Sequence, residues 1–371
     1  MARQQQPANQ RLLPDISAVG DFVADLSPDG STQEDGSRIG VREVELALQA
    51  AVDPYFRGDV FIGFHDGEVA IEQAYLTATA LPWGVEGRIG RFLMPFGKDN
   101  TSHRHDLHTI EHAYVIQRFL GEEGLKGTGL YAGKVFAPFG FFQELILTAT
   151  EGFPEEHGHE EEEEEELITL EPASDELSGL LYSARFRNYW DFSEAANLEL
   201  SASALTGKRP QPIDPPSLDP AVNAINARQS LVGVDVTFRW RPLQEGLYRS
   251  FLARAEVMWQ LNEEDPEIPA ELPLATTYEG PSDDFSGAYL FARYQLTRRL
   301  FIEGRYDVLD DPEVDGDNFM AASGYLEWFP SEFSKLVAGV ERVTPAGDAD
   351  GFTRILLQAT FAIGPHRPHP F

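Results

Sequence analysis

Histidines gather in two short stretches of this sequence, at spacings that suit a metal ion. The candidate ligands are His103, His105, His108, His112, His157 and His159. A His-x-His pair, or two histidines four residues apart on a helix, brings imidazoles close enough to share a zinc or copper ion. Histidine-rich loops also occur without any metal, so a metal site and a solvated polar loop are both open interpretations.

An unbroken run of glutamates at 160–166 follows the second histidine pair. Like charges at this density repel one another, and they predict a solvated acidic loop at 153–176. Its carboxylates would attract calcium or magnesium, and the histidines beside them would attract zinc. We therefore expect no required cofactor and, at most, loosely bound calcium, magnesium or zinc on outer loops. Such loops could also bind the ions that bridge lipopolysaccharide phosphates.

Composition excludes several classes of function. The chain of 371 residues has no cysteine, which rules out thiolate metal sites, disulfides and thiol nucleophiles. Its net charge of -32 would repel phosphates, so nucleic acid is not an expected partner. The sequence contains no nucleophile elbow, no zinc-hydrolase helix motif and no phosphate-binding glycine loop. We therefore expect a protein that is not an enzyme.

The elements that position these residues are short segments in which polar and apolar side chains alternate. The last of them, from Phe352, carries Ile355 and Leu357 on an apolar face and Arg354 on a polar face. About sixteen such segments follow one another, and the connections between them alternate between tight turns and longer loops. Aromatic residues cluster at the tight turns, as at a membrane interface. A soluble β-sandwich gives no reason for this alternation of loop lengths.

These patterns predict an all-β fold, a transmembrane antiparallel β-barrel of about 16 strands with long external loops and short periplasmic turns. The mean hydropathy of -0.30 fits this fold, because each strand exposes only every second side chain to lipid. We expect a periplasmic N-terminal extension at 1–14, the barrel at 15–364 and a C-terminal tail at 365–371. The N-terminus lacks the apolar core of an export signal, so we presume that a signal peptide has been removed.

A long loop at 97–126 is the expected constriction of the barrel. Residues 107–120 within it have helical spacing, and Gly121 supplies a stop signal. In barrels of this size an early long loop commonly folds inward and narrows the channel. The alternative is an external helix that lies on the rim.

Three stretches resemble a known family. They are Leu13-Pro14-Asp15-Ile16-Ser17, Gly121-Glu122-Glu123-Gly124-Leu125 and Gly364-Pro365-His366-Arg367-Pro368-His369-Pro370-Phe371. They resemble a family of uncharacterised bacterial outer-membrane proteins, often called zinc-regulated outer-membrane receptors. The layout is similar to that of phosphate-selective-type porins. The resemblance implies the location and the fold, and it implies no substrate.

The inner wall follows from the alternation, because neighbours of lipid-facing residues face the lumen. The predicted pore-lining residues are Arg185, Arg187, Arg239, Arg254, Glu256, Arg293, Glu303, Arg305, Glu327 and Arg354. Arginines on a pore wall favour anions at the waist, whereas acidic outer loops enrich cations at the mouth. Because selectivity is set at the narrowest point, we expect a weak or moderate anion preference. Alternatively, these residues pair with one another and simply keep the wall rigid.

We therefore expect an outer-membrane porin that allows passive diffusion of small hydrophilic solutes or ions through a water-filled pore. Two alternatives stay open: a zinc-type metal-ion uptake channel or receptor, and a closed structural or interaction barrel. Inward Tyr289 and Phe291 would favour the closed barrel. Expected partners are outer-membrane lipid and lipopolysaccharide, and a homotrimer is an expectation by analogy alone.

Overall fold

The computed structural model describes residues 14–33, 36–65, 68–151, 169, 173–175, 177–214, 222–269, 272, 276–310, 317–347 and 349–364. The expected N-terminal extension up to residue 13, most of the acidic loop and the C-terminal tail lie outside these residues. No helix in the described ranges is long and apolar enough to cross a membrane.

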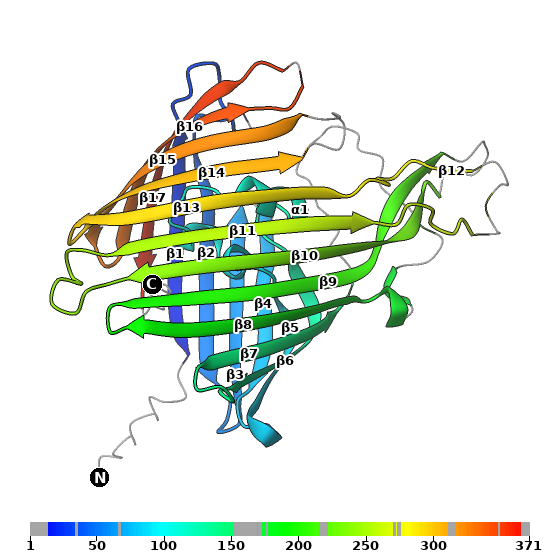
Figure 1. Cartoon of the computed structure of the whole chain (residues 1–371), viewed down its shortest axis with the longest axis horizontal. Coiled ribbons are helices and arrows are strands. Elements are labelled where there is room, and N and C mark those ends of the chain that lie inside the picture. Colours follow the sequence, from blue (N-terminus) through cyan, green and yellow to red (C-terminus); the bar gives the residue numbers. More distant parts are fainter. Residues whose placement is uncertain are drawn as a thin grey trace, which may run out of the picture.

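The described residues form an antiparallel β-barrel of sixteen long strands, as predicted, together with one two-residue strand (Figure 1). The strands are β1 (Asp15–Asp25), β2 (Ile39–Ala51), β3 (Phe56–His65), β4 (Glu68–Ala78), β5 (Val85–Leu93), β6 (Lys126–Phe136), β7 (Phe142–Thr150), β8 (Leu181–Ser193), β9 (Ala196–Asp214), β10 (Ala224–Trp240), β11 (Phe251–Asn262), β12 (Thr277–Tyr278), β13 (Phe285–Thr297), β14 (Leu300–Asp310), β15 (Asn318–Ser331), β16 (Ser334–Thr344) and β17 (Phe352–Ile363). One α-helix, α1 (Tyr114–Leu120), and short 3₁₀ turns at Pro82–Gly84, Asp99–Thr101, Arg104–Asp106, Ala173–Asp175 and Leu177–Gly179 complete the elements.

The barrel closes where its first and last strands meet. β1 pairs with β17 in antiparallel register from Ala18 opposite Ile363 to Asp25 opposite Leu356, and on its other edge with β2. Closure gives every long strand a neighbour on each side within the barrel wall, which is the condition for crossing lipid with strands.

Burial is inverted relative to a soluble protein. On β16, Lys335 and Glu341 face inward and are buried, whereas Leu336 and Val340 face outward and are exposed. An apolar outer surface around a polar interior is the pattern of a barrel in lipid. Exposed aromatic residues mark the rim with the short turns: Tyr55, Trp83, Phe139, Phe192, Tyr248 and Phe333.

Two connections differ from the sequence-based expectation. β3 and β4 are joined by a very short link on the long-loop rim. The proline-rich stretch 207–228, whose composition alone indicates a loop, instead continues β9 as far as Asp214 and begins β10 at Ala224. The extended β9–β10 hairpin projects beyond the neighbouring strands (Figure 1).

Prolines fit this extension because β9 has lost its β8 neighbour there, and β12 pairs with that edge only at Ile213 and Asp214. β8 pairs with β9 only up to Thr206, and β10 continues beside it. The Ile213 N–H donates to Asn223 O at 2.9 Å, so that Ile213 faces β10. Pro210 and Pro212 have the opposite parity, and their missing N–H groups therefore point away from the ladder.

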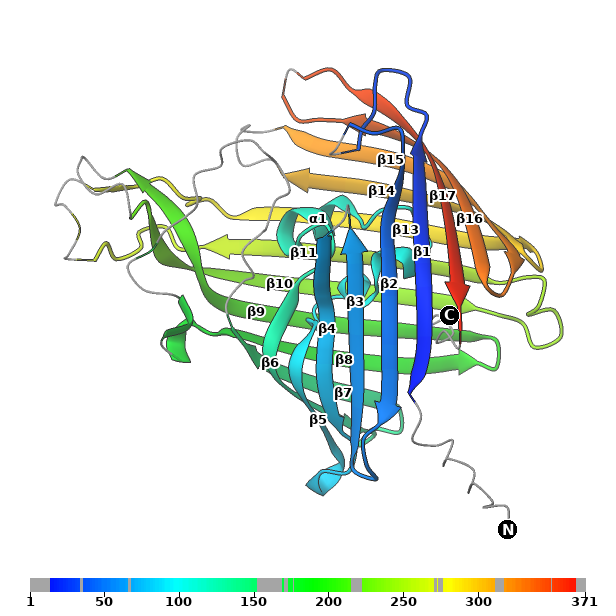
Figure 2. The ribbon, with the colours of Figure 1, turned by 180° about the vertical axis from the view of Figure 1, so that it is seen from behind.

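The connection from β5 to β6 turns into the barrel. We call residues 94–125 the inner segment. In both ribbon views α1 lies between the front and back walls (Figures 1 and 2). The helix is shorter than the helical spacing predicted, because residues 107–113 are not helical, but it ends at Gly121 as expected, with φ of 87°.

Candidate functional site inside the barrel

The inner segment enters the lumen at Gly97. This residue has φ of 59°, and a Cβ atom there would lie 1.6 Å from Glu256 Oε1 on β11. Only glycine accepts this backbone conformation without strain and leaves room for the carboxylate. Glu256 accepts hydrogen bonds from the Lys98 N–H at 3.2 Å and from the Tyr289 hydroxyl at 3.2 Å. The segment is therefore seated against β11 from its first turn.

Lys98 and Asp99 connect the start of the segment to the wall. Lys98 Nζ lies 2.9 Å from Glu199 Oε1 on β9, and Asp99 Oδ1 lies 2.5 Å from Arg254 Nη1 on β11. Burial lowers the pKa of Lys98 to about 8, although Glu199 acts in the opposite direction. Burial would raise the pKa of Asp99, but His112 and Arg254 hold it well below its usual range. Both contacts join charges, so their loss would leave a charge unpaired inside the lumen.

Glu111 is the second anchor, in the middle of the segment. Its carboxylate lies 2.9 Å from Arg104 Nε and 3.1 Å from Arg42 Nη1 on β2. Burial would raise the pKa of Glu111, but Arg104 and Arg42 outweigh burial and lower it to about 2. The backbone carbonyl of Glu111 accepts a hydrogen bond from Arg305 on β14 at 2.7 Å. Glu111 therefore has partners on two different parts of the wall.

The middle and end of the segment are bonded to β14 and β16, two strands late in the chain. The Tyr114 hydroxyl donates to Glu341 Oε1 on β16 at 2.7 Å, and the Tyr114 N–H donates to Asp307 Oδ1 on β14 at 3.0 Å. Lys335 on β16 donates to the carbonyls of His105 and Leu107 at 2.8 and 2.7 Å. The inner segment thus spans the lumen from β2 to β9, β11, β14 and β16.

Apolar side chains fill the space around the segment. Its members Met94, Phe96, Val115 and Ile116 are buried against residues from many strands. The wall side chains in this cluster include Phe92, Tyr131, Ile146, Leu181, Leu205, Leu231, Met258, Phe285, Tyr289, Phe291 and Leu309. Such packing adds an apolar cluster to the polar lumen, on the part of the wall from β5 to β14.

Tyr289 and Phe291 belong to this cluster. Each is only 4% exposed, and Phe291 stacks on His108 with ring centroids 6.0 Å apart. Both side chains face inward from β13, as the sequence suggested. Their packing narrows the waist of the barrel.

The residues predicted to line a pore lie on strands of the wall, and each has a polar partner. The pairs are Arg185 with Asp235 (3.5 Å), Arg187 with Glu144 (2.9 Å), Arg239 with Glu199 (3.6 Å), Arg254 with Asp99 (2.5 Å), Arg293 with Glu303 (2.8 Å) and with Glu327, Arg305 with Asp307 (2.8 Å), Arg354 with Glu341 (3.4 Å), and Glu256 with Tyr289 (3.2 Å). These guanidinium groups therefore form a network with carboxylates, as the second interpretation of the wall expected.

Sequence reasoning missed several carboxylates of this network. Glu199 and Glu341 face the lumen. Each lies on the polar face of its strand, so the alternation of polar and apolar residues could have located both. Leu198 and Leu200 flank Glu199 on the apolar face of β9 in the same alternation that located Arg239. The acidic residues are not confined to the loops, because buried carboxylates occur on most strands of the wall.

The four described histidines of the inner segment have different neighbours. His103 and His105 face β2, His108 lies against Glu327, and His112 lies 3.3 Å from Asp99. The prediction that His108 and His112 share a metal as a helical pair is wrong. Residues 107–113 are not helical, so four-residue spacing does not place both imidazoles on one face. His157 and His159 lie outside the described residues.

The surroundings of His105 and His108 shift the pKa values of these two residues in opposite directions. Burial and the nearby Arg293 lower the pKa of His108 to about 4. Burial would also lower the pKa of His105, but Asp106, Glu43 and Glu45 outweigh it and raise the pKa to about 9. The negative field around His105 would also favour a bound cation.

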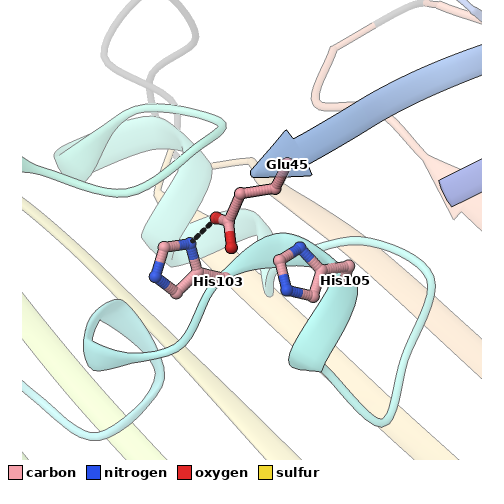
Figure 3. A group of neighbouring side chains, drawn as sticks. All are labelled: Glu45, His103 and His105. Carbon is pink, nitrogen blue, oxygen red and sulfur yellow. Dashed lines mark ion pairs between the residues drawn. The ribbon is translucent and has the colours of Figure 1, made fainter. Parts of the chain in front are cut away.

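Three groups of side chains in the described residues have ligand atoms close enough for a metal ion. They are Glu45 with His103 and His105, His65 with Glu72 and Glu123, and His108 with Glu303 and Glu327. Figure 3 shows the first group, in which the Glu45 carboxylate from β2 points toward the two imidazoles of the inner segment. Two imidazoles and a carboxylate suit zinc and similar dications.

Comparison with known proteins identifies solved structures that have a similar fold. No family model matches the chain. An uncharacterized protein from Aquifex aeolicus (strain VF5) is 26% identical over 404 residues, covering 100% of this chain and 82% of that protein. Among solved structures, the outer membrane channel DcaP of Acinetobacter baumannii has a TM-score of 0.53 at 13% identity, covering 94% of this chain and 96% of that one. The anion-selective porin from Comamonas acidovorans has a TM-score of 0.56 at 9% identity, with 94% and 98% covered.

OmpT, an outer membrane protein of Vibrio cholerae, also has a TM-score of 0.56, at 9% identity, covering 94% of this chain and 97% of that one. At these identities the similarity concerns the fold. The chain has the architecture of outer-membrane porins.

Proposed function

We propose that this protein is an outer-membrane channel of the porin type, in which the inner segment is the constriction. Its passive pore would admit small hydrophilic solutes or ions and would perform no enzymatic reaction. The observation that carries the proposal is the attachment of the inner segment to opposite walls, through Glu111 to β2 and β14 and through Asp99 to β11. A segment held in this way narrows the lumen without being part of the wall.

The paired charges of the waist bear on its selectivity. Arginine predominates in the predicted set of wall residues, so the expected preference remains for anions. Because the guanidinium groups of that set have carboxylate partners, the net field at the waist is small, and we propose that the preference is weak. Because the inner segment occupies much of the lumen, we expect the channel to favour ions and the smallest solutes over larger ones.

The direct experiment is single-channel recording in planar bilayers, with a salt gradient to obtain the reversal potential. The comparison is between the complete chain and a variant in which a short glycine-serine linker replaces residues 97–125. We expect small, stable steps for the complete chain and much larger steps for the variant. A control variant shortens the β9–β10 hairpin beyond the barrel and should conduct like the complete chain. Equal conductance in all three would show that the inner segment does not narrow the pore.

A closed barrel is the second candidate, and the packing of Tyr289 and Phe291 favours it. Each side chain is buried inside the lumen, in a cluster that includes residues from β5 to β14. This candidate predicts no conductance for the complete chain but a large conductance when the inner segment is removed. The same recordings therefore separate the two candidates.

The proposed location is the bacterial outer membrane, with the long loops outside and the short turns in the periplasm. The exposed apolar outer surface and the aromatic rim support the membrane location, and the short turns on one rim with longer loops on the other support the orientation. Outer-membrane lipid and lipopolysaccharide would be the immediate partners. A solved form of OmpT from Vibrio cholerae is described as a trimer. A homotrimer is accordingly our proposal for this chain, to be tested by native mass spectrometry.

A further inference from the structure

One of the three potential metal groups differs from the others in how its charge is balanced. In the group of His65, Glu72 and Glu123, Lys126 contacts both carboxylates. In the group of His108, Glu303 and Glu327, Arg293 contacts both carboxylates. A side-chain cation therefore already occupies the place that a metal ion would take.

The third group has no such cation. Glu43 and Glu45 are buried neighbours on the inner face of β2, and within the described parts of the chain neither lies within ion-pair distance of a lysine or an arginine. Their partners are imidazoles: His103 Nδ1 lies 2.8 Å from Glu45 Oε2, and His105 Nδ1 lies 3.6 Å from Glu43 Oε2. Two buried carboxylates with only histidines for compensation favour a bound dication.

Glu45 and His103 already direct their ligand atoms toward one another, at a distance somewhat shorter than that between two ligands of one zinc ion. The two atoms are 2.8 Å apart, yet Glu45 Oε2 receives no hydrogen bond and is buried. Ligand atoms around a tetrahedral zinc ion, with bonds of about 2.0–2.1 Å, lie about 3.3 Å apart. The ligand atoms of Glu45, His103 and His105 all lie within 4.8 Å of one another, so small side-chain rotations bring all three to one ion.

We propose that Glu45, His103 and His105 bind one divalent transition-metal ion of the zinc type inside the barrel. Such an ion would join β2 to the inner segment. Two imidazoles and one carboxylate are a common donor set for zinc, and they leave one position for water. His103 is the most exposed of the three side chains, at 17%, so we expect an ion to reach the site from its side.

Gln73 on β4 supports the orientation of His103. Its Nε2 lies 2.7 Å from His103 Nε2, which directs the other ring nitrogen, Nδ1, toward Glu45. A metal at Nδ1 requires a proton on Nε2. If the Gln73 amide turns over, its oxygen accepts a hydrogen bond from that N–H, at the cost of the hydrogen bond that it now accepts from the Leu93 N–H.

The test is cobalt and zinc binding by the complete purified chain in detergent. Cobalt(II) in a tetrahedral site with nitrogen and oxygen ligands has characteristic visible absorption bands, and zinc displaces it in a competition titration. All variants carry H157A and H159A, so that the second histidine pair cannot contribute. We expect one equivalent of cobalt with tetrahedral bands, and a loss of affinity of roughly 100-fold or more in E45Q, H103Q and H105Q.

Matched controls are H65Q and H108Q, which alter the two groups already balanced by Lys126 and Arg293 and should bind like the parent. The heat-dependent shift in gel mobility confirms that each variant is folded, and E45Q alone suffices if a histidine variant does not fold. Unchanged affinity in E45Q, loss of binding in H65Q or H108Q, or no binding once His157 and His159 are removed would each overturn the proposal. None of these readouts depends on conductance, so the site can be judged whether or not the barrel conducts.

Discussion

Arg305 donates a hydrogen bond of 2.7 Å to the backbone carbonyl of Glu111, 194 positions earlier in the chain. The same guanidinium lies 2.8 Å from Asp307 and 3.4 Å from Glu341. One buried cation thus joins the inner segment to β14 and β16. Because β14 and β16 come late in the chain, these contacts can form only when the closing strands are in place.

Replacement of Arg305 by methionine should destabilise the barrel strongly. The variant leaves Asp307 and Glu341 buried without their common guanidinium and removes a bond to the inner segment. Breaking a buried ion pair from one side typically costs about 3–5 kcal/mol. The free energy of unfolding, measured by urea titration of the protein in lipid vesicles, should fall by about that amount.

The matched control for this variant is Arg249 to methionine. Arg249 is 60% exposed and pairs with Glu245 at 3.1 Å on the short-turn rim. Exposed pairs contribute about 1 kcal/mol or less. A similar loss in both variants would show that the position of Arg305 in the lumen has no special importance.

Acid should loosen the inner segment through Glu111. Its pKa in the folded chain is about 2, below its ordinary value of 4.5. A depressed carboxyl pKa contributes stability that is fully present above the ordinary value and is lost as the pH falls through the folded value. The free energy of unfolding of the parent should therefore decline between about pH 4.5 and 2, and the decline should be smaller in E111Q. Identical pH profiles would contradict the role of Glu111 as an anchor.

The wall of the barrel could be predicted from the sequence because its cause is local. Every second residue of a strand faces the same side, and lipid selects apolar side chains there, as on β16 with Leu336 and Val340 outside. The same alternation located Arg239 and Arg293 on the inner face. Strand ends were less predictable. Pro210 and Pro212 indicate a loop, and only the structure shows that β9 continues there because it no longer pairs with β8.

The contacts of the inner segment could not be predicted in this way. Asp99 meets Arg254, 155 positions away, only because the closed barrel brings β11 around the entry of the segment. The spacing of the histidines suggested a metal site, but only the fold brings Glu45 on β2 next to them. The polar strand face that Glu45 shares with Glu43 was visible in the sequence, whereas its contact with His103 was not.

Gly97 should be required for the entry of the inner segment. Alanine there meets strain from the positive φ of 59° and a Cβ position 1.6 Å from Glu256 Oε1. Alanine at Gly140, where φ is 82° and no atom lies within 4 Å of the Cβ, meets the backbone strain alone. We expect G97A to lose more stability than G140A and to open larger or noisier channels. Equal effects of the two substitutions would mean that the contact between Gly97 and Glu256 on β11 tolerates a methyl group.

Phe291 should limit the width of the waist. Its ring is 4% exposed inside the lumen and stacks on His108 of the inner segment, so alanine there removes packing between the segment and β13. Leu290, the preceding residue, faces outward and is 57% exposed, which makes L290A a control on the same strand. Single-channel recordings should show a higher conductance for F291A than for the parent, and no change for L290A. If F291A leaves the conductance of an open channel unchanged, the narrowest point lies elsewhere along the inner segment. If the parent is silent and F291A conducts, the ring is part of the barrier that closes the barrel.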